Sequence, residues 1–420
     1  MAKRRGPGDG ALYKREDGLW IGRVDVPPGP DGKRRVRSVS SKDRATAAEK
    51  LRKLQADIAV GEVVTGPAST VGEWLDYWIA NIHRSKVKPG TRQDYARVIR
   101  NHIKPHIGAK KLSNLQPEDV LAMQQAISTK TTRTAQVAHH IVNRALNDAV
   151  LWKRCTRNPA AVVPTPTHSK SDRQPFTPEE ARRIIRAAEE IDGTGSGPLL
   201  ASRWAAAFGT GARKGELLGL TWDRVDLDNG TIDLSWQLHQ LPQKHGCGEV
   251  QQGATPQWPC GRTKAAYCPE RTFDVDPGDE FIPCHRGLAW VRPKTAAGKR
   301  LMPLVPGLAQ RLLAHREATE PGPNNLVWHH RDGRPVSHKD DHTLWQELLC
   351  RAGLREPGGP TIDQHRTRNT TLTVLLDAGV DPHIIDSAVG HSDVSMTRGY
   401  QYVDLTLTRQ AFNHLSALFD

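Results

Sequence analysis

Hydrophobic and polar positions along the chain fall into three patterned blocks separated by two polar, Pro- and Gly-containing seams. We expect domains at residues 1–64, 70–163 and 176–420, joined by linkers near 61–69 and 164–175. A length of 420 residues agrees with this division, because about 150 residues per domain gives roughly three domains.

The first block is typical of a small α+β module, a three-stranded sheet plus one helix. Apolar and polar side chains alternate over 19–26, as in a half-buried strand. After a Pro- and Gly-rich turn, Lys33, Arg35 and Arg37 share one face of the next strand, because side chains repeat every second residue. Helical spacing over 47–58 predicts an amphipathic helix on the other face of the sheet. The three basic residues are therefore candidates for DNA binding.

The second block predicts an all-α domain. A capping box at Thr70 opens the first helix, Thr91 the second, and Pro117 stands at the first position of the third. A fourth helix covers 137–150. Basic side chains on the second helix are further candidates for DNA binding, although a solvated helix face is the simpler explanation for any one of them: Arg92, Arg97 and Arg100.

The third block begins with a capping box at Thr177 and contains a glycine-rich turn, 209–215, that leads into a helix. This turn places Arg213 near a helix N-terminus, where backbone N–H groups favour an anion. Alone, such an arginine is more often a surface residue. Farther on stand His365 and Arg368, then an apolar helix, then Gly390-His391, and Tyr400 nine positions later.

This ordered set resembles the tyrosine recombinase (phage integrase) family. The resemblance implies a mixed α/β, mainly helical catalytic domain of tyrosine-recombinase type, a helical (SAM-like) core-binding domain and an N-terminal module for arm-type DNA sites. It also implies a catalytic lysine on a β-hairpin, which fits Lys294, with Lys299 as the competing choice. Gln364 and the run 367–369 depart from the family's commoner aspartate-leucine-arginine-histidine run.

The chemistry of phosphodiester cleavage explains these residue types. Arg213 and Arg368 supply permanently charged donors for a phosphate whose negative charge grows during attack. Tyr400 is the nucleophile, with Tyr402 as a rival, and His365 accepts its proton or positions it. Lys294 protonates the leaving 5′ oxygen.

Two more side chains complete this interpretation. His391 binds a nonbridging phosphate oxygen, and Glu216 orients an arginine rather than acting as an acid. Because a phosphotyrosine ester stores the energy of the broken bond, neither ATP nor a catalytic metal is needed.

Composition supports a polyanionic partner. Lys and Arg number 59 against 46 Asp and Glu, a net charge of +13. The mean hydropathy of −0.57 and the lack of a long apolar run exclude an integral membrane protein, and no apolar segment follows the basic start as a signal peptide requires. We expect a cytoplasmic protein of the bacterial or phage-host cytosol.

Four of the six cysteines gather between the Arg213 and Lys294 elements: Cys247, Cys260, Cys268 and Cys284. Four thiolates could hold a structural zinc ion, with His245 and His285 beside the outer pair. The spacings lack a paired C-x₂₋₄-C motif, so reduced cysteines in a loop are the alternative.

The sequence as a whole predicts a site-specific recombinase or integrase that joins DNA through a 3′-phosphotyrosine. Its expected partners are double-stranded attachment-site DNA and three further protomers in a tetramer, with an excisionase or DNA-bending protein as an accessory. The alternatives are a type IB topoisomerase-like enzyme, which would use nearly the same side chains, and a non-catalytic sequence-specific DNA-binding protein.

Overall fold

The computed structural model describes residues 10–26, 35–59, 69–168, 174–195, 197–251, 257–293, 300–390 and 405–419. The chain forms two compact units, Met1–Lys170 and Ser171–Asp420, so the boundary lies inside the predicted 164–175 linker. The three finer domain boundaries, 1–64, 70–163 and 176–420, stay predictions. No helix within the described ranges has the length and hydropathy needed to cross a membrane.

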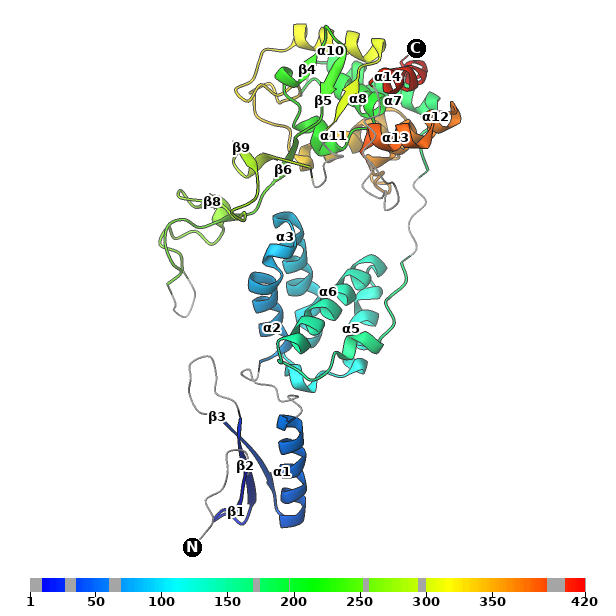
Figure 1. The fold of residues 1–420 in the computed structure, drawn as a ribbon. Coiled ribbons are helices and arrows are strands. Elements are labelled where there is room, and N and C mark those ends of the chain that lie inside the picture. The colour runs from blue at the N-terminus through cyan, green and yellow to red at the C-terminus, as the bar shows by residue number, and fades with distance from the viewer. Residues whose placement is uncertain are drawn as a thin grey trace. The chain divides into compact units, whose positions relative to one another are not determined.

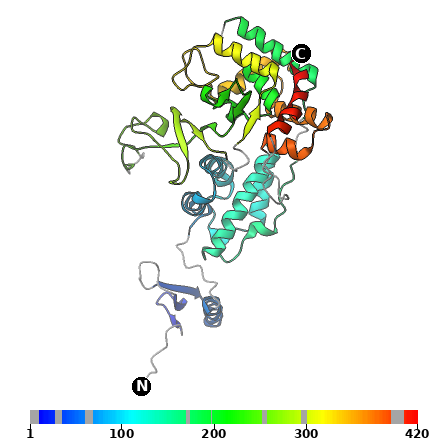
Figure 2. The ribbon, with the colours of Figure 1, turned by 45° about the horizontal axis from the view of Figure 1, so that its top comes forward.

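The N-terminal part of the first unit is a sheet with one helix packed on it (Figures 1 and 2). Its strands run antiparallel in the order β1-β2-β3. Val24, Ala47 and Leu51 are buried between the sheet and the helix. This arrangement confirms the predicted three-stranded sheet plus helix; the elements are β1 (Ala11–Lys14), β2 (Trp20–Val26), β3 (Arg35–Ser41) and α1 (Arg44–Ala59).

Strand register corrects the predicted placement of the basic face. Val24 pairs with Arg37, and directly opposed residues of antiparallel strands project to the same side. Gly22 lies on that side too, and a Cβ added to it would approach Leu51 of α1 to 3.0 Å. The face of Arg37 is therefore the face that α1 covers, not the opposite one. Alternation assigns sides within each strand, but the pairing of strands decides which sides coincide.

The face of the sheet away from α1 exposes Tyr13 and Arg23. Arg37 is nevertheless exposed on its own side. Arg35 begins β3, and Lys33 lies outside the described residues.

The remainder of the first unit is all-helical, as predicted. The capping box at Thr70 is formed, since the Thr70 hydroxyl accepts from the backbone N–H of Glu73 and the Glu73 carboxylate accepts from that of Thr70. The second predicted helix begins at Pro89 rather than at Thr91. Two π-helical turns, 78–82 and 99–103, follow α2 and α3. The α-helices are α2 (Val71–Tyr77), α3 (Pro89–Val98), α4 (Lys104–Ile107), α5 (Pro117–Ser128) and α6 (Thr132–Leu151).

Two buried tryptophans fix the first of these helices against the last. The indole N–H of Trp74 donates to the carbonyl of Ala145 at 2.9 Å, and that of Trp78 donates to Asp148 at 2.7 Å. Burying both rings with their polar atoms paired gives the block its own core.

The second unit is mainly helical around one large core, in agreement with the predicted mixed α/β catalytic domain. Its first helix starts at the predicted capping box of Thr177 and Glu180. Every residue of α8 is buried, so this helix forms the centre of the domain. The helices are α7 (Pro178–Gly193), α8 (Ala201–Thr210), α9 (Lys214–Leu218), α10 (Pro306–Ala318), α11 (His338–Arg351), α12 (His365–Asp377), α13 (Pro382–Val389) and α14 (Leu405–Phe412).

Three small antiparallel sheets complete the second unit, in the orders β11-β5-β4, β6-β10-β9 and β7-β8. Their strands are β4 (Val225–Asp226), β5 (Thr231–Asp233), β6 (Gln237–Gln240), β7 (Gln243–Lys244), β8 (Thr272–Phe273), β9 (Phe281–His285), β10 (Leu288–Val291) and β11 (Leu301–Pro303).

The strands flanking the predicted lysine hairpin do not pair with each other. Both edges of β10 are occupied, by β6 and β9, while β11 pairs with β5 in a different sheet. The expectation of a simple hairpin between them is therefore wrong, because β6 and β9, which both precede β10 in the chain, occupy its two edges. Lys294 and Lys299 themselves lie outside the described residues.

The C-terminal segment packs on its own domain. Phe412, Leu415 and Leu418 are buried in the main core. Phe419 packs closely on two glycines, Gly209 of α8 and Gly307 of α10. A Cβ added to Gly209 would lie 2.9 Å from the Phe419 ring, and one added to Gly307 would lie 2.9 Å from the Phe419 Cβ. The segment 405–419 is therefore part of the core of its own domain.

Candidate active site

A glycine in the left-handed backbone conformation forms the turn at which the site begins. Helix α8 ends at Thr210, and Gly211 adopts φ +59°, which L-residues rarely adopt. A Cβ here would also meet Thr371 of α12 at 3.2 Å. The turn brings Arg213 to the N-cap of α9, as the glycine-rich pattern predicted.

Glu216, 1% exposed, is the centre of the site's hydrogen bonds. Its carboxylate accepts from the backbone N–H of Arg213 at 2.8 Å and from the Arg213 guanidinium at 3.0 Å. Arg300 donates to both of its oxygens, at 3.1 and 2.8 Å. Burial raises the pKa of Glu216, but Arg300 and Arg213 outweigh it and hold that pKa below its usual value. The geometry agrees with the expected role of orienting an arginine.

Arg300 is a site residue that the sequence analysis missed. Its side chain is 6% exposed, and its Nε donates to the carbonyl of Ala388 at 2.7 Å. Its carboxylate partner lies 84 positions earlier in the chain. No local spacing marks such a pair, although an arginine directly before a strand in the expected lysine element was the available signal.

Arg368 brings a nearly buried guanidinium, 2% exposed, from α12. Its Nη1 donates to the carbonyl of Gly211 at 2.8 Å, whereas its buried Nη2 has no hydrogen-bond partner in the part of the chain that the structure describes. Burial and the nearby charges of Arg213 and Arg300 lower the pKa of Arg368 to about 9. A bound anion would accept a hydrogen bond from this nitrogen and would offset the surrounding positive charges.

A cavity of about 510 Å³ brings three of the six predicted catalytic residues together: Arg213, His365 and Arg368. Its other walls are Ala207, Ala212, Lys214, Leu217, His342, Thr361, Asp363, Gln364 and Thr367. Lys294, His391 and Tyr400 lie outside the described residues. The carbonyl of Gly390, the residue before His391, accepts from Nη2 of Arg213 at 2.5 Å.

A buried ion pair lies beneath the start of α12. Arg203 and Asp341 are both 0% exposed and lie 2.8 Å apart. With its amide oriented to satisfy both, Gln364 accepts from Arg203 and donates to Asp341 at 2.9 Å. This explains the departure at position 364, since an amide satisfies a cation and an anion together. The contact anchors the residue that precedes His365.

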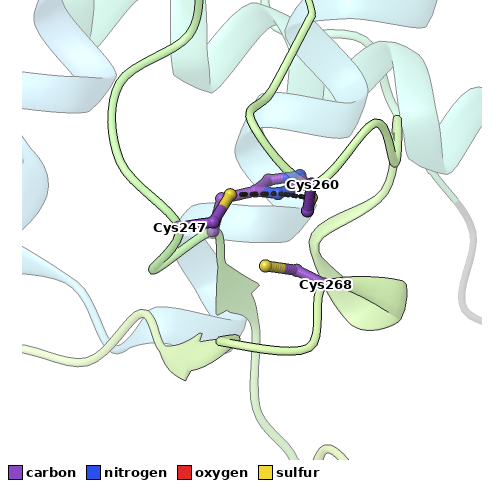
Figure 3. A group of neighbouring side chains, drawn as sticks. Cys247, Cys260 and Cys268 are labelled. Carbon is purple, nitrogen blue, oxygen red and sulfur yellow. Dashed lines mark hydrogen bonds between the residues drawn. The ribbon is translucent and has the colours of Figure 1, made fainter.

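Among the predicted metal ligands, three of four come together. Cys247, Cys260 and Cys268 lie with His245 in a group whose ligand atoms are all within 4.8 Å of one another (Figure 3). Cys284 is not part of it: it lies in β9 against the main core, and burial raises its pKa to about 12. The four-cysteine assignment is therefore corrected to Cys247, Cys260, Cys268 and His245. Cys284 lies apart from them because β9 pairs with β10 in the β6-β10-β9 sheet.

Cys268 is the fully buried member of this group. Burial raises the pKa of its thiol, but the backbone of Gly246 and Glu270 and the neighbouring thiols of Cys247 and Cys260 lower that pKa to about 7.

The predicted DNA-binding arginines of α3 and the following turn differ in exposure. Arg97 is exposed and paired with Asp94 at 2.8 Å, and Arg100 is exposed as well. Arg92 is 7% exposed and offers little of its guanidinium to a duplex.

The cavity's composition defines its chemistry. Arg213 and Arg368 line the cavity, and with Arg300 they surround the carboxylate of Glu216, so positive charge is in excess around an Arg368 nitrogen that has no acceptor within the described residues. Such a site is suited to a phosphate whose oxygens gain charge during reaction. With His365 in the same wall, the fold and site define a phosphoryl-transfer enzyme.

Comparisons with known proteins identify the family. The description "Phage integrase, N-terminal SAM-like domain" matches residues 70–128, and "Phage integrase family" matches 280–406. An integrase of Streptomyces ambofaciens is 32% identical over 408 residues, 94% of this chain and 92% of that protein. An integrase of Saccharopolyspora erythraea is 28% identical over 98% of this chain and 97% of that protein.

Solved structures share the fold. The Tn1549 transposon integrase in complex with a circular intermediate DNA matches with a TM-score of 0.56 at 18% identity, over 82% of this chain and 95% of that chain. A lambda integrase dimer bound to a COC' core site matches with a TM-score of 0.52 at 17% identity, over 96% and 100%.

The chain belongs to the phage integrase family of tyrosine recombinases. It is a site-specific recombinase, an enzyme that cleaves and rejoins DNA strands.

Proposed function

We propose that this recombinase integrates a mobile element by forming a 3′-phosphotyrosine ester at Tyr400, with the scissile phosphate bound in the Arg213–Arg368 cavity. The observation that carries this proposal is the buried, unpartnered Nη2 of Arg368 beside Arg213 and Arg300. Two guanidiniums on the nonbridging oxygens stabilise the charge that grows as the phenol attacks.

Proton transfers fall to the remaining predicted residues. His365, in the cavity wall, accepts or positions the proton of the attacking phenol. His391 donates a hydrogen bond to a nonbridging oxygen; its chain neighbour Gly390 already binds Arg213, which supports this role. Lys294, with Lys299 as the alternative, protonates the 5′ oxygen as its bond to phosphorus breaks.

No catalytic metal enters this mechanism. The tyrosyl ester retains the energy of the broken phosphodiester, and the 5′ hydroxyl of another strand later attacks it to regenerate Tyr400. Cleavage is therefore expected in Mg²⁺-free buffer, since arginines supply the charge that metal ions supply elsewhere.

The partners we propose are attachment-site duplexes and three further copies of the chain. A lambda integrase tetramer bound to a Holliday junction shares this fold with a TM-score of 0.52, which supports a tetramer here. Exposed Arg97 and Arg100 suit phosphate contacts by the helical domain. The reaction takes place in the cytoplasm, and an excisionase or DNA-bending protein sets its direction.

The deciding experiment is the trapping of a covalent adduct. Purified protein is incubated with nicked attachment-site DNA, and SDS-resistant protein–DNA complexes are counted. Tyr400→Phe is expected to abolish the adduct while DNA binding survives, and the control Tyr402→Phe to retain it. An adduct that persists in Tyr400→Phe contradicts the assignment of the nucleophile.

The N-terminal sheet is proposed to bind a second class of DNA site, the arm sequences. Deleting residues 1–64 should abolish binding to DNA arms and leave weaker cleavage at the core site, because the cavity lies wholly in the second unit. Gel shifts on DNA with and without arms measure this. Unchanged arm binding and integration would favour the topoisomerase-like alternative instead.

A further inference from the structure

We propose that His245, Cys247, Cys260 and Cys268 bind one structural Zn²⁺ ion that holds the insertion between β7 and β8 in its fold. The ion's site is separate from the cavity, which none of these four residues lines. The proposal does not depend on the recombination mechanism.

The four side chains are arranged as a ligand set. Nδ1 of His245 lies 3.4 Å from Sγ of Cys260 and 3.8 Å from Sγ of Cys247, and all four ligand atoms lie within 4.8 Å of one another. Figure 3 shows the three labelled cysteines converging from separate stretches of the insertion. All three are free thiols rather than disulfides.

Backbone geometry around the sulfurs supports metal binding. Glycines with positive φ, Gly248 at +112° and Gly261 at +67°, follow two of the cysteines directly. Such turns fold the chain around a sulfur.

The insertion needs a stabilising centre that it does not otherwise contain. Between β7 and β8, each two residues long, Cys268 is the one fully buried residue of the described positions, while Val250 and Tyr267 are exposed. In both views the segment carrying β8 projects from the rest of the second unit (Figures 1 and 2). Closing so long a loop costs entropy that no apolar core offsets here, and a bound metal supplies that free energy.

The donor set selects zinc and a structural role. Three thiolates and one imidazole match the tetrahedral preference of Zn²⁺, and four protein ligands leave no open position for a substrate. The ring of His245 stacks on Trp258, with centroids 4.1 Å apart and planes 5° from parallel. This contact holds the imidazole in place for coordination.

Metal analysis of the full-length protein tests the proposal. Protein expressed with zinc in the medium should contain about one zinc per chain by elemental analysis, as a closed four-ligand site requires. Cys247→Ser and Cys268→Ser should lose it. Cys284→Ala, which removes the cysteine outside the group, and Cys350→Ser should keep it. Metal-free wild type, or loss of zinc in Cys284→Ala but not in Cys247→Ser, overturns the proposal.

A second measurement applies even if the serine variants fail to fold. Wild-type protein is stripped of metal and titrated with Co²⁺, whose visible spectrum distinguishes tetrahedral thiolate ligation from octahedral oxygen ligation. The expected result is a tetrahedral thiolate spectrum that Zn²⁺ displaces, together with protection of the insertion from limited proteolysis. An octahedral spectrum, or a disulfide between these cysteines in freshly prepared protein, overturns the assignment.

Discussion

Two buried charged clusters in the second unit use the same residue types and differ in their balance. Arg203 and Asp341 form one pair, both fully buried, and Gln364 hydrogen-bonds to each of them. The other cluster sets Glu216 against Arg213 and Arg300, with Arg368 beside them. Within the described residues both clusters keep a buried guanidinium nitrogen without a hydrogen bond, but the first cluster is neutral whereas the second carries excess positive charge.

The difference in charge balance distinguishes a cluster that stabilises the fold from a cluster that is suited to bind a ligand. A buried pair of matched charge holds elements in register, here α8, α11 and the start of α12. A cluster that keeps uncompensated charge is destabilising by itself and persists where a ligand of opposite charge completes it. The same guanidinium group is thus part of a charge-balanced pair at position 203, whereas at position 368 we propose that it binds phosphate.

The largest expected effect comes from breaking the balanced pair. Asp341→Ala leaves Arg203 charged and buried without its countercharge, which should lower the free energy of unfolding by about 3–5 kcal/mol. Chemical denaturation measures the change. As a control, Asp332→Ala removes a carboxylate paired with Arg334 at the surface and should cost no more than about 1 kcal/mol. Equal losses in the two variants would mean that the buried pair carries no special weight.

Removing an arginine from the unbalanced cluster should reverse the pattern. Arg368→Ala is expected to reduce cleavage by roughly 3 kcal/mol, about a hundredfold, with little loss of stability because an uncompensated charge is removed. Adduct formation under single-turnover conditions and denaturation together measure this. Arg366→Ala, the same change on the same helix, is the control. Near-normal cleavage by Arg368→Ala would remove this residue from the phosphate site.

Sequence alone predicted what local patterns encode. The capping boxes at Thr70 and Thr177, the glycine-rich turn over 209–215 and the all-helical second block are all formed, because each depends on residues a few positions apart. The ordered spacing from Arg213 to Tyr400 carried the family assignment. In the described part of the site, Arg213, His365 and Arg368 line one cavity as expected.

What sequence could not supply was pairing over long distances. Arg300 binds Glu216, which lies 84 positions earlier in the chain, and β10 pairs with β9 rather than with β11. The metal ligand set needed His245 in place of Cys284 for the same reason. The spacing of residues in the sequence identifies candidate ligands, but the tertiary structure determines which of them lie close together.

The third test uses pH to separate charge from shape at the centre of the unbalanced cluster. Glu216→Gln keeps the side-chain size and should cost about 1.5–3 kcal/mol at pH 7, as for a hydrogen bond to charged groups. Because the pKa of Glu216 is lower in the folded protein than its ordinary 4.5, its ionised form stabilises the fold above that pH. This contribution is lost as pH falls through the folded pKa.

The gap in Tm between wild type and Glu216→Gln should therefore be widest near neutral pH and narrow below about pH 4. Thermal unfolding monitored by circular dichroism from pH 7 to pH 3 measures it. Glu347→Gln, at an exposed position of α11, should show no such convergence. A gap that stays constant with pH would assign the role of Glu216 to packing rather than to charge.

The smallest effect extends the comparison to arginines on the surface. Arg97 is 64% exposed and bound only by Asp94 within the described residues, so its guanidinium can exchange that partner for a phosphate. If it contacts one phosphate, Arg97→Ala should lower the slope of log affinity against log salt by about 0.9. Arg186→Ala is the matched control, because Arg186 is equally exposed at 64% and pairs with Glu179 in the second unit. Filter binding to core-site DNA over a range of salt concentrations measures both slopes. Equal slopes for the two variants would leave Arg97 as a solvated ion pair, whereas a difference near 0.9 would show that an exposed arginine acts by exchanging its partner.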